Sequence, residues 1–237
     1  MKYELTGETR NYVPNGTLHR IRAMRDIPIH GVKEGDLGGW VESEYNLSQD
    51  GNSWVSLNVW VFGNARVYGN ASLYGHCRVS GDSRVYGDAI VHGDSRVYGN
   101  ARVYGNARVY GDAFVHGDAR VYGSAEAFGS SQIYGNALVG DDAEVSGDAE
   151  VSKSSHILTA KIFTSMPLSA TAFRHADGSW QARVGCWSGS LPELRDLTES
   201  DQWVETPPEE VWEARPELLA FVSLCEARAA RITRLNM

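Results

Sequence analysis

Cysteine is scarce in this chain, and the spacing of the few thiols excludes two kinds of site. The 237 residues contain three cysteines, Cys77, Cys186 and Cys225, which lie far apart and form no Cys-x-x-Cys pair. A zinc site needs closely spaced ligands, and a disulfide framework needs an even set of thiols. Neither is expected here. The spacing of histidine and acidic residues suggests no metal site and no cofactor either.

Long apolar runs and a basic surplus are also missing. No segment approaches the roughly 20 apolar residues of a membrane span, and residues 1–5 contain no apolar core of a signal peptide. We therefore expect a cytoplasmic protein without membrane contact. The formal net charge is −8 and is spread along the chain. Binding of nucleic acid is not expected from such a charge.

Proline is rare, at 7 residues, whereas glycine is abundant, at 25, and the glycines belong to a repeat. From Val55 to Val151 every sixth residue is aliphatic, over seventeen consecutive positions. A series of small residues, mostly alanine, lies four residues after each of them. Between the two series comes a corner, usually Gly followed by Asn or Asp, as in Gly105-Asn106.

Each six-residue unit predicts a short strand and a turn. Alternation along the strand points Ala101 and Val103 inward and Arg102 and Tyr104 outward. Gly105 then turns the chain, because glycine tolerates the positive φ of a tight corner. A single unit cannot bury its apolar side, so the units must stack on one another.

Three units per turn give coils of 18 residues, and nearly six coils about 4.8 Å apart make a shaft about 25–30 Å long. We predict a mainly β fold, a left-handed parallel β-helix of hexapeptide repeats with an N-terminal β cap and a C-terminal α+β module. A right-handed parallel β-helix is the alternative, but its coils are longer and less regular. The expected segments are 1–54 for the cap, 55–155 for the β-helix and 156–237 for the module.

The two ends have patterns of their own. Residues 18–27 of the cap are β-like. In the module, 156–163, 170–174 and 180–187 predict strands, and 176–179 predict a hairpin turn. Residues 191–197 and 207–235 predict helices.

The repeat resembles the left-handed β-helix hexapeptide-repeat superfamily, best known from trimeric acyltransferases. Its entry segment, with Gly35 to Val41, Asn46 to Ser48 and Trp54-Val55, is similar to a narrower group. These are the bacterial and prophage proteins of the YdcK type, described as acetyltransferases largely from their fold. The resemblance covers roughly residues 33–155. It implies the fold more than the activity, because one fold hosts many functions.

Histidines are the first residues to consider for an acyltransferase. Enzymes of this superfamily place a histidine base in a cleft between subunits, often beside a loop inserted into the coils. Here the seventeen units follow one another without an insertion. His92 and His116 stand where Tyr usually stands, His76 stands at a corner, and His175 lies beside the predicted hairpin turn. We expect all four to be surface residues, and no catalytic residue is assigned.

Arginine and tyrosine form the most uniform outward pattern. Every eighteenth residue falls on the same side of the predicted β-helix. One side therefore carries Arg66, Tyr68, Arg84, Tyr86, Arg102, Tyr104, Arg120 and Tyr122. Guanidinium groups stacked about 5 Å apart repel one another.

Three kinds of compensation are open for these arginines. The first is internal, by stacking on the tyrosines and pairing with the corner residues Asp82, Asp88, Asp112 and Asp118. The second is a protein partner or a second copy of the chain, since Arg and Tyr are enriched at protein interfaces. The third, phosphate binding, is opposed by the acidic corners.

The sequence thus favours a non-catalytic oligomeric scaffold, a dimer or trimer, which binds a protein partner through this side or through the C-terminal module. An acyl-CoA-dependent acyltransferase is the alternative. The prophage resemblance adds a third hypothesis, an accessory phage protein that acts on a host factor in the host cytoplasm.

Overall fold

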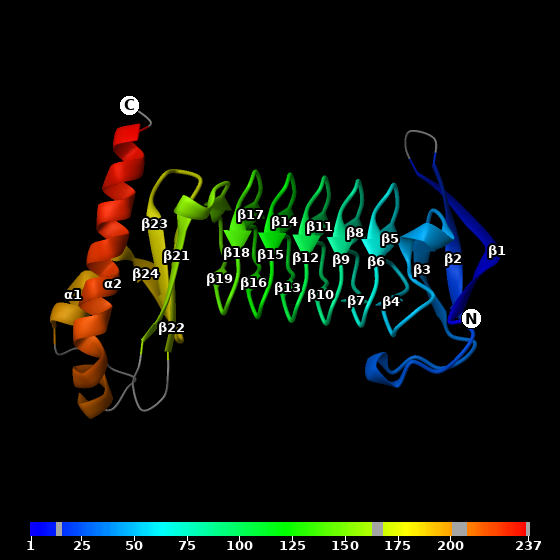
Figure 1. Cartoon of the computed structure of the whole chain (residues 1–237), viewed down its shortest axis with the longest axis horizontal. Helices are drawn as coiled ribbons and strands as arrows, with labels where there is room; N and C mark the ends of the chain where they lie inside the picture. Colours follow the sequence, from blue (N-terminus) through cyan, green and yellow to red (C-terminus); the bar gives the residue numbers. More distant parts are fainter. Residues whose placement is uncertain (13–15, 163–167, 201–207, 236–237) are drawn as a thin grey trace.

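A parallel β-helix forms the middle of the molecule and is covered at both ends (Figure 1). The computed structural model describes residues 1–12, 16–162, 168–200 and 208–235. Antiparallel strands cover the first coil, and a four-stranded antiparallel sheet with two helices lies beyond the last. The mainly β fold predicted from the hexapeptide repeat, with about six coils, is confirmed.

The β-helix has three faces, each named here by its first strand. Within a face, each strand pairs in parallel with the next one, which lies 18 residues later. The β4 face contains β4 (Trp54–Val55), β7 (Ser72–Leu73), β10 (Ile90–Val91), β13 (Arg108–Val109), β16 (Glu126–Ala127) and β19 (Glu144–Val145). The β5 face contains β5 (Trp60–Val61), β8 (Arg78–Val79), β11 (Arg96–Val97), β14 (Phe114–Val115), β17 (Gln132–Ile133) and β20 (Glu150–Val151). The β6 face contains β6 (Arg66–Val67), β9 (Arg84–Val85), β12 (Arg102–Val103), β15 (Arg120–Val121) and β18 (Leu138–Val139).

The inward residues fill the shaft. Val103, Ala101 and Ala107 have no exposed surface, as the alternation predicts. The corners depend on glycine for two reasons. Gly105 has a φ of 73°, and a Cβ at this position would lie 3.0 Å from the carbonyl oxygen of Gly123 in the next coil. Glycine therefore allows both the turn and the close stacking of coils.

The N-terminal cap extends the β5 face. Strand β2 (Gly16–Ala23) pairs antiparallel with both β1 (Tyr3–Tyr12) and β3 (Leu37–Val41), and β3 pairs in parallel with β5. Two 3₁₀ helices, η1 (Pro28–His30) and η2 (Glu44–Asn46), lie in the connections. The side chain of Tyr3 is fully buried, and its hydroxyl donates a 2.7 Å hydrogen bond to the Leu47 carbonyl. These contacts close the first coil.

The C-terminal segment begins with η3 (Ser154–His156), where the repeat ends. Its sheet contains β21 (Ile157–Ile162), β22 (Leu168–Arg174), β23 (Trp180–Val184) and β24 (Trp187–Ser190), and its helices are α1 (Leu191–Glu199) and α2 (Pro208–Leu235). Figure 1 shows the sheet between the last coil and the helices. Phe173 belongs to the same buried cluster as the shaft, whereas Ala172 belongs to the cluster with the helices. The sheet therefore has two buried sides.

The strand predicted over 180–187 is wrong in one respect, because it is two strands. Val184 pairs with Trp187 across a tight turn, and Gly185 takes a φ of 55° there. The turn contains only Gly185 and Cys186 and is flanked by Val184 and Trp187, so no polar residue marks the boundary between the two strands. The hairpin turn at 176–179 and both helices agree with the prediction, although Phe163 and Pro207, the predicted ends of two elements, lie outside the described residues.

Lys2 is a buried cation in the N-terminal cap, only 1% exposed. Its Nζ donates hydrogen bonds to the carbonyl and the hydroxyl of Ser53, at 2.8 and 3.0 Å. Burial, helped by the nearby charge of Arg25, lowers the pKa of Lys2 from its ordinary 10.5 to about 8, while Asp50 acts in the opposite direction. The folded protein therefore loses this proton at a lower pH than the unfolded chain does.

This difference predicts a pH dependence of stability. Between pH 8 and 10 the unfolded chain binds more protons at Lys2 than the folded chain, so the contribution of Lys2 to the free energy of unfolding rises with pH. We compare the free energy of unfolding of Lys2→Met with that of the parent at each pH. The difference, variant minus parent, should be about 1–2 kcal/mol higher at pH 8 than at pH 10. Urea unfolding across this range measures the difference. The exposed Lys153→Met is the control, and a parallel pair of curves for parent and Lys2→Met would contradict the prediction.

Candidate functional site: the Arg/Tyr face

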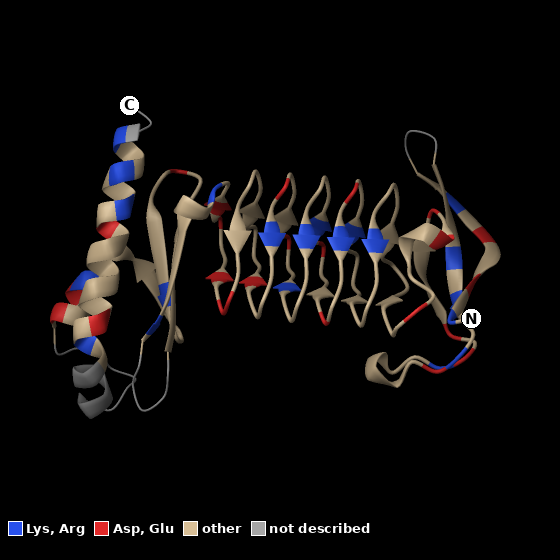
Figure 2. Ribbon diagram, in the orientation of Figure 1, with Lys and Arg blue, Asp and Glu red and all other residues tan. Residues whose placement is uncertain are grey.

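The outward side of the β6 face carries a column of arginines, with a tyrosine following each strand. We call this surface the Arg/Tyr face, and its residues are Arg66, Tyr68, Arg84, Tyr86, Arg102, Tyr104, Arg120 and Tyr122. Arg66 pairs with Arg84, Arg84 with Arg102, and Arg102 with Arg120 in the strand register. The 18-residue stacking predicted from the sequence is therefore confirmed, and Figure 2 shows the four strands as a single basic row.

The tyrosines form a continuous stack beside the arginines. Their ring centroids are 4.8 Å apart for Tyr68 and Tyr86, 5.0 Å for Tyr86 and Tyr104, and 5.5 Å for Tyr104 and Tyr122. Partial burial and the neighbouring phenols raise the pKa of Tyr86, so its hydroxyl stays protonated at neutral pH. The stack gives the face a rigid aromatic edge with hydroxyl groups along it.

The arginines of the other two faces have partners on their own face. Arg108 forms a 3.2 Å ion pair with Glu126. Arg78 lies over the ring of Trp60 at 4.8 Å, and Arg96 lies over Phe114 at 5.1 Å.

On the Arg/Tyr face, Arg66 has such neighbours, the ring of Tyr45 at 4.8 Å and that of Tyr68 at 5.8 Å. Within the described ranges 1–12, 16–162, 168–200 and 208–235, the guanidinium groups of Arg84, Arg102 and Arg120 form no ion pair, hydrogen bond or cation–π contact.

The predicted pairing of these arginines with corner aspartates is not found in the described part of the chain. Asp82 and Asp118 do line a shallow hollow of about 220 Å³ together with Arg84, Arg102 and Arg120. However, Asp82 accepts a 2.9 Å hydrogen bond from the amide of Asn64, and Asp118 accepts one from Asn100. Asparagine and aspartate thus pair with one another along the corners, because coil stacking brings their side chains closer than the arginines.

The histidines lie where the repeat places them. His92 stacks between Tyr74 and Tyr110, and His116 between Tyr98 and Tyr134. Partial burial lowers the pKa of both rings, so they are neutral at pH 7.

The other two histidines have polar neighbours. His76 is 3.7 Å from Asp94, and His175 hydrogen-bonds Gln181 at 2.7 Å. No cluster of three metal-ligating side chains occurs among the residues that the structure describes.

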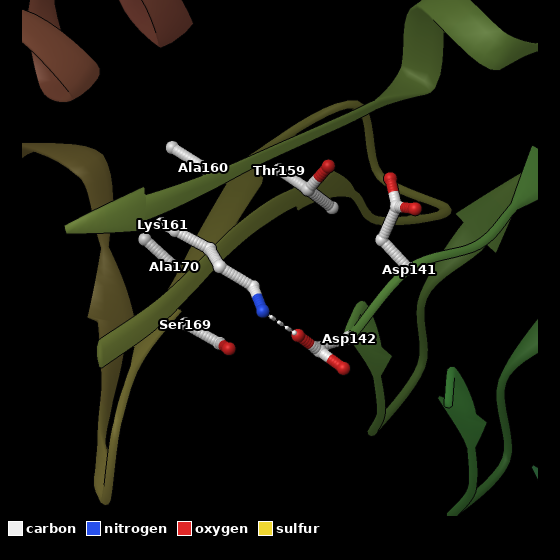
Figure 3. A pocket seen from close by; sticks show the side chains of 7 residues that line it. All are labelled: Asp141, Asp142, Thr159, Ala160, Lys161, Ser169 and Ala170. Atoms are coloured by element: carbon white, nitrogen blue, oxygen red, sulfur yellow. Dashed lines mark ion pairs between the residues drawn. The ribbon is translucent and has the colours of Figure 1, made fainter. Parts of the chain in front are cut away.

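A second hollow lies between the last coil and the C-terminal sheet. It has a volume of about 280 Å³, and Figure 3 shows Lys161 of β21 reaching across it to Asp142, with a 2.7 Å ion pair. Asp141 stands beside it with a φ of 55°, at a corner position that glycine holds in most other units. The residue before it is Gly140, and any side chain at this position would clash with Tyr122, because a Cβ would lie 2.2 Å from the tyrosine ring. This departure from the repeat ends the tyrosine stack.

Residues 95–111 and 101–117 match the family model of the YdcK β-solenoid repeat. The chain is a β-helix repeat protein of the YdcK type. No curated protein matches it in sequence at a significant level. In the described part of this YdcK-type chain, no helix is long and apolar enough to cross a membrane.

Sequence reasoning found the column of arginines but missed two features of the site. It did not recognise that the arginines of the other faces are compensated, although Trp60 and Phe114 lie 18 residues from Arg78 and Arg96 and therefore beside them on the same face. It also missed the aromatic stacks at the other corners, such as Tyr74 on His92. The 18-residue period contains this information, because it pairs 74 with 92 and 98 with 116.

Proposed function

We propose that this protein is a non-catalytic β-helix scaffold that binds protein through the Arg/Tyr face, with a second copy of the chain as its first partner. The observation that supports the proposal is the group Arg84, Arg102 and Arg120, which lie side by side in the strand register and whose guanidinium groups form no ion pair or hydrogen bond within the described chain. Neighbouring unit charges about 5 Å apart repel by roughly 0.8 kcal/mol even at the dielectric constant of water. A surface that supplies carboxylates relieves this repulsion.

The charge of the face restricts how two copies can meet. A two-fold contact of this face with itself would set arginine against arginine. A heterologous contact, in which the Arg/Tyr face of one copy meets a different face of the next, avoids this and closes into a ring when the rotation fits.

The chain offers an acidic surface for such a contact. Figure 2 shows acidic residues on β16 and β19 at the last coils of the β4 face. They are Glu126 and Glu144, which stack on one another in register. Each has an arginine neighbour in its own chain, Arg108 and Arg183 respectively. A carboxylate can accept further hydrogen bonds from a second guanidinium group.

Of the dimer and the trimer expected from the sequence, this arrangement predicts the trimer, because a heterologous contact does not close between two copies. Its assembly should depend on the residues of the tyrosine stack. Tyr86→Glu/Tyr104→Glu places two acids beside the arginines, which then pair within the chain and no longer need a partner. We expect the variant to run as a monomer where the parent is an oligomer. Gel filtration with light scattering measures both masses.

The matched control is Tyr98→Glu/His116→Glu, which changes two stacked rings at the corner that follows the β5 face. It has the same number of new carboxylates and should keep the parent's mass. A monomeric parent, or a Tyr86→Glu/Tyr104→Glu variant that keeps the parent's mass, would refute self-association through this face. Calorimetric titration with acetyl-CoA tests the acyltransferase alternative, and saturable micromolar binding would favour that alternative over the scaffold.

A further inference from the structure

A third hollow lies on the β4 face, under the loop that contains η1. Its volume is about 550 Å³, larger than that of the two hollows on the Arg/Tyr face and beside Lys161. The loop contributes Ile29 and His30, and the β-helix contributes Ser56, Ser72, Tyr74 and Ile90. Figure 1 shows this loop standing away from the shaft beside the first coils. The small side chain of Ser72, between Trp54 and Ile90 in the register, leaves the space open.

One wall of this hollow is the open end of an aromatic stack. Tyr74, His92, Tyr110 and Phe128 stack in order with centroid distances of 4.5, 5.0 and 4.9 Å. The position one coil before Tyr74 belongs to Ser56, which has no ring. Within the described part of the chain, no ring covers the side of Tyr74 that faces away from His92.

The cap shows how such an end is covered elsewhere. Phe62, the first ring at the corner after the β5 face, is contacted by Tyr12 of β1, with the ring centroids 4.6 Å apart and the ring planes tilted by 45°. The corner after the β4 face has no corresponding ring from the cap, and Tyr74 remains 41% exposed. A planar group of the right thickness therefore has a place in the stack.

An unsatisfied hydrogen-bonding group belongs to a residue that lines the same space. The Nε2 atom of His30 is buried and has no hydrogen-bond partner, although His30 lines the hollow. Burial lowers the pKa of His30, with the carbonyl groups of Asn52 and Asn70 acting in the opposite direction and Lys2 adding to the lowering. The ring is therefore neutral at pH 7. Asp88 also lines the hollow, and its carboxylate accepts a 2.9 Å hydrogen bond from the side-chain amide of Asn70.

We propose that this hollow binds a planar heteroaromatic molecule that carries an N–H donor. The ring would stack on the open side of Tyr74, above Ser56, and continue the aromatic column by one member. Its N–H group would donate a hydrogen bond to Nε2 of His30, the atom that otherwise remains unsatisfied. Ile29 and Ile90 would contact its apolar edge. The volume is within the usual range of small-molecule sites, and the inference does not depend on the scaffold role of the Arg/Tyr face.

Ligand-observed NMR with benzimidazole, indole and adenine tests this inference on the full-length protein. We expect saturable binding of at least one of the three rings and no binding of cyclohexylmethanol, which has a similar size but no aromatic face. Methylation of the donor nitrogen should weaken binding of the same ring at least tenfold. Failure of all three rings to bind, or equal binding of the methylated ring, would overturn the inference.

Two serine variants locate the site. Ser56→Tyr supplies the missing ring from the chain itself and should abolish binding of the probe. Ser80→Tyr, the matched control, fills the gap between Phe62 and Tyr98 at the corner after the β5 face and should leave binding unchanged. Melting temperatures of both variants show that they are folded. Probe binding that survives in Ser56→Tyr, or that disappears in the control, would place the ligand elsewhere and refute the inference.

Discussion

Val103→Asp should lower the free energy of unfolding by about 3–5 kcal/mol, because it places a carboxylate in the middle of a dry shaft. Val103 has no exposed surface, and Val85 and Val121 lie directly above and below it in the register. The nearby backbone donors are already engaged in the ladder: the amide of Tyr86 donates to the Val103 carbonyl at 3.0 Å, and that of Tyr104 to the Val121 carbonyl at 3.0 Å. The new carboxylate would find no hydrogen bond.

In a repeat protein, the loss of stability caused by Val103→Asp extends beyond the substituted coil. A coil derives its stability from the coils on either side, so the loss of one rung weakens two interfaces. Urea unfolding followed by circular dichroism measures the effect. Gln132→Asp, which places the same carboxylate on an exposed outward position of β17, should change the unfolding free energy by about 0.5 kcal/mol or less. Equal midpoints for parent and Val103→Asp would show that the inward series is wrongly assigned.

The sequence predicted the shaft well because its period is regular. A side chain such as Val103 has no alternative position once the 18-residue coil is fixed, and the corner at Gly105 follows from its positive φ. The two ends were predicted less completely. Nothing in the period indicates that β1 and β2 extend the β5 face, or that residues 180–190 form two strands that turn at Gly185. These features depend on contacts between distant segments.

The candidate site shows the same division. The column of Arg84, Arg102 and Arg120 could be counted from the sequence, but its lack of partners could not. That property depends on side-chain reach, since Asp118 is held by Asn100 rather than by an arginine. The hollow at Tyr74 was not predicted, because it requires the η1 loop to place Ile29 and His30 over the β4 face. Sequence periodicity describes the shaft and says little about the loops that lie on it.

Phe173→Ala should cost about 3–5 kcal/mol, because this ring closes the C-terminal end of the shaft. Phe173 on β22 is fully buried in the same cluster as Val145 and Val151 of the last coils. An alanine would leave a cavity at the point where the β-helix has no further coil to stack upon. Thermal unfolding measures the loss, and Phe114→Ala, which truncates an outward and partly exposed ring on β14, is the matched control with an expected cost of about 1 kcal/mol.

Amide hydrogen exchange shows which part of the shaft Phe173→Ala destabilises, and so distinguishes opening of the last coil from a loss of stability along the whole shaft. An uncovered last coil should open locally, since the strands β18, β19 and β20 would become unprotected edges. We expect hydrogen exchange to accelerate at the amides of Gln132 and Tyr134, which donate to the Ala149 and Val151 carbonyls of the last coil. The amide of Arg84, which donates to the Ala101 carbonyl nearer the middle, should keep most of its protection. Uniform acceleration along the shaft would instead mean that the coils unfold as one unit and that Phe173 stabilises all of them equally.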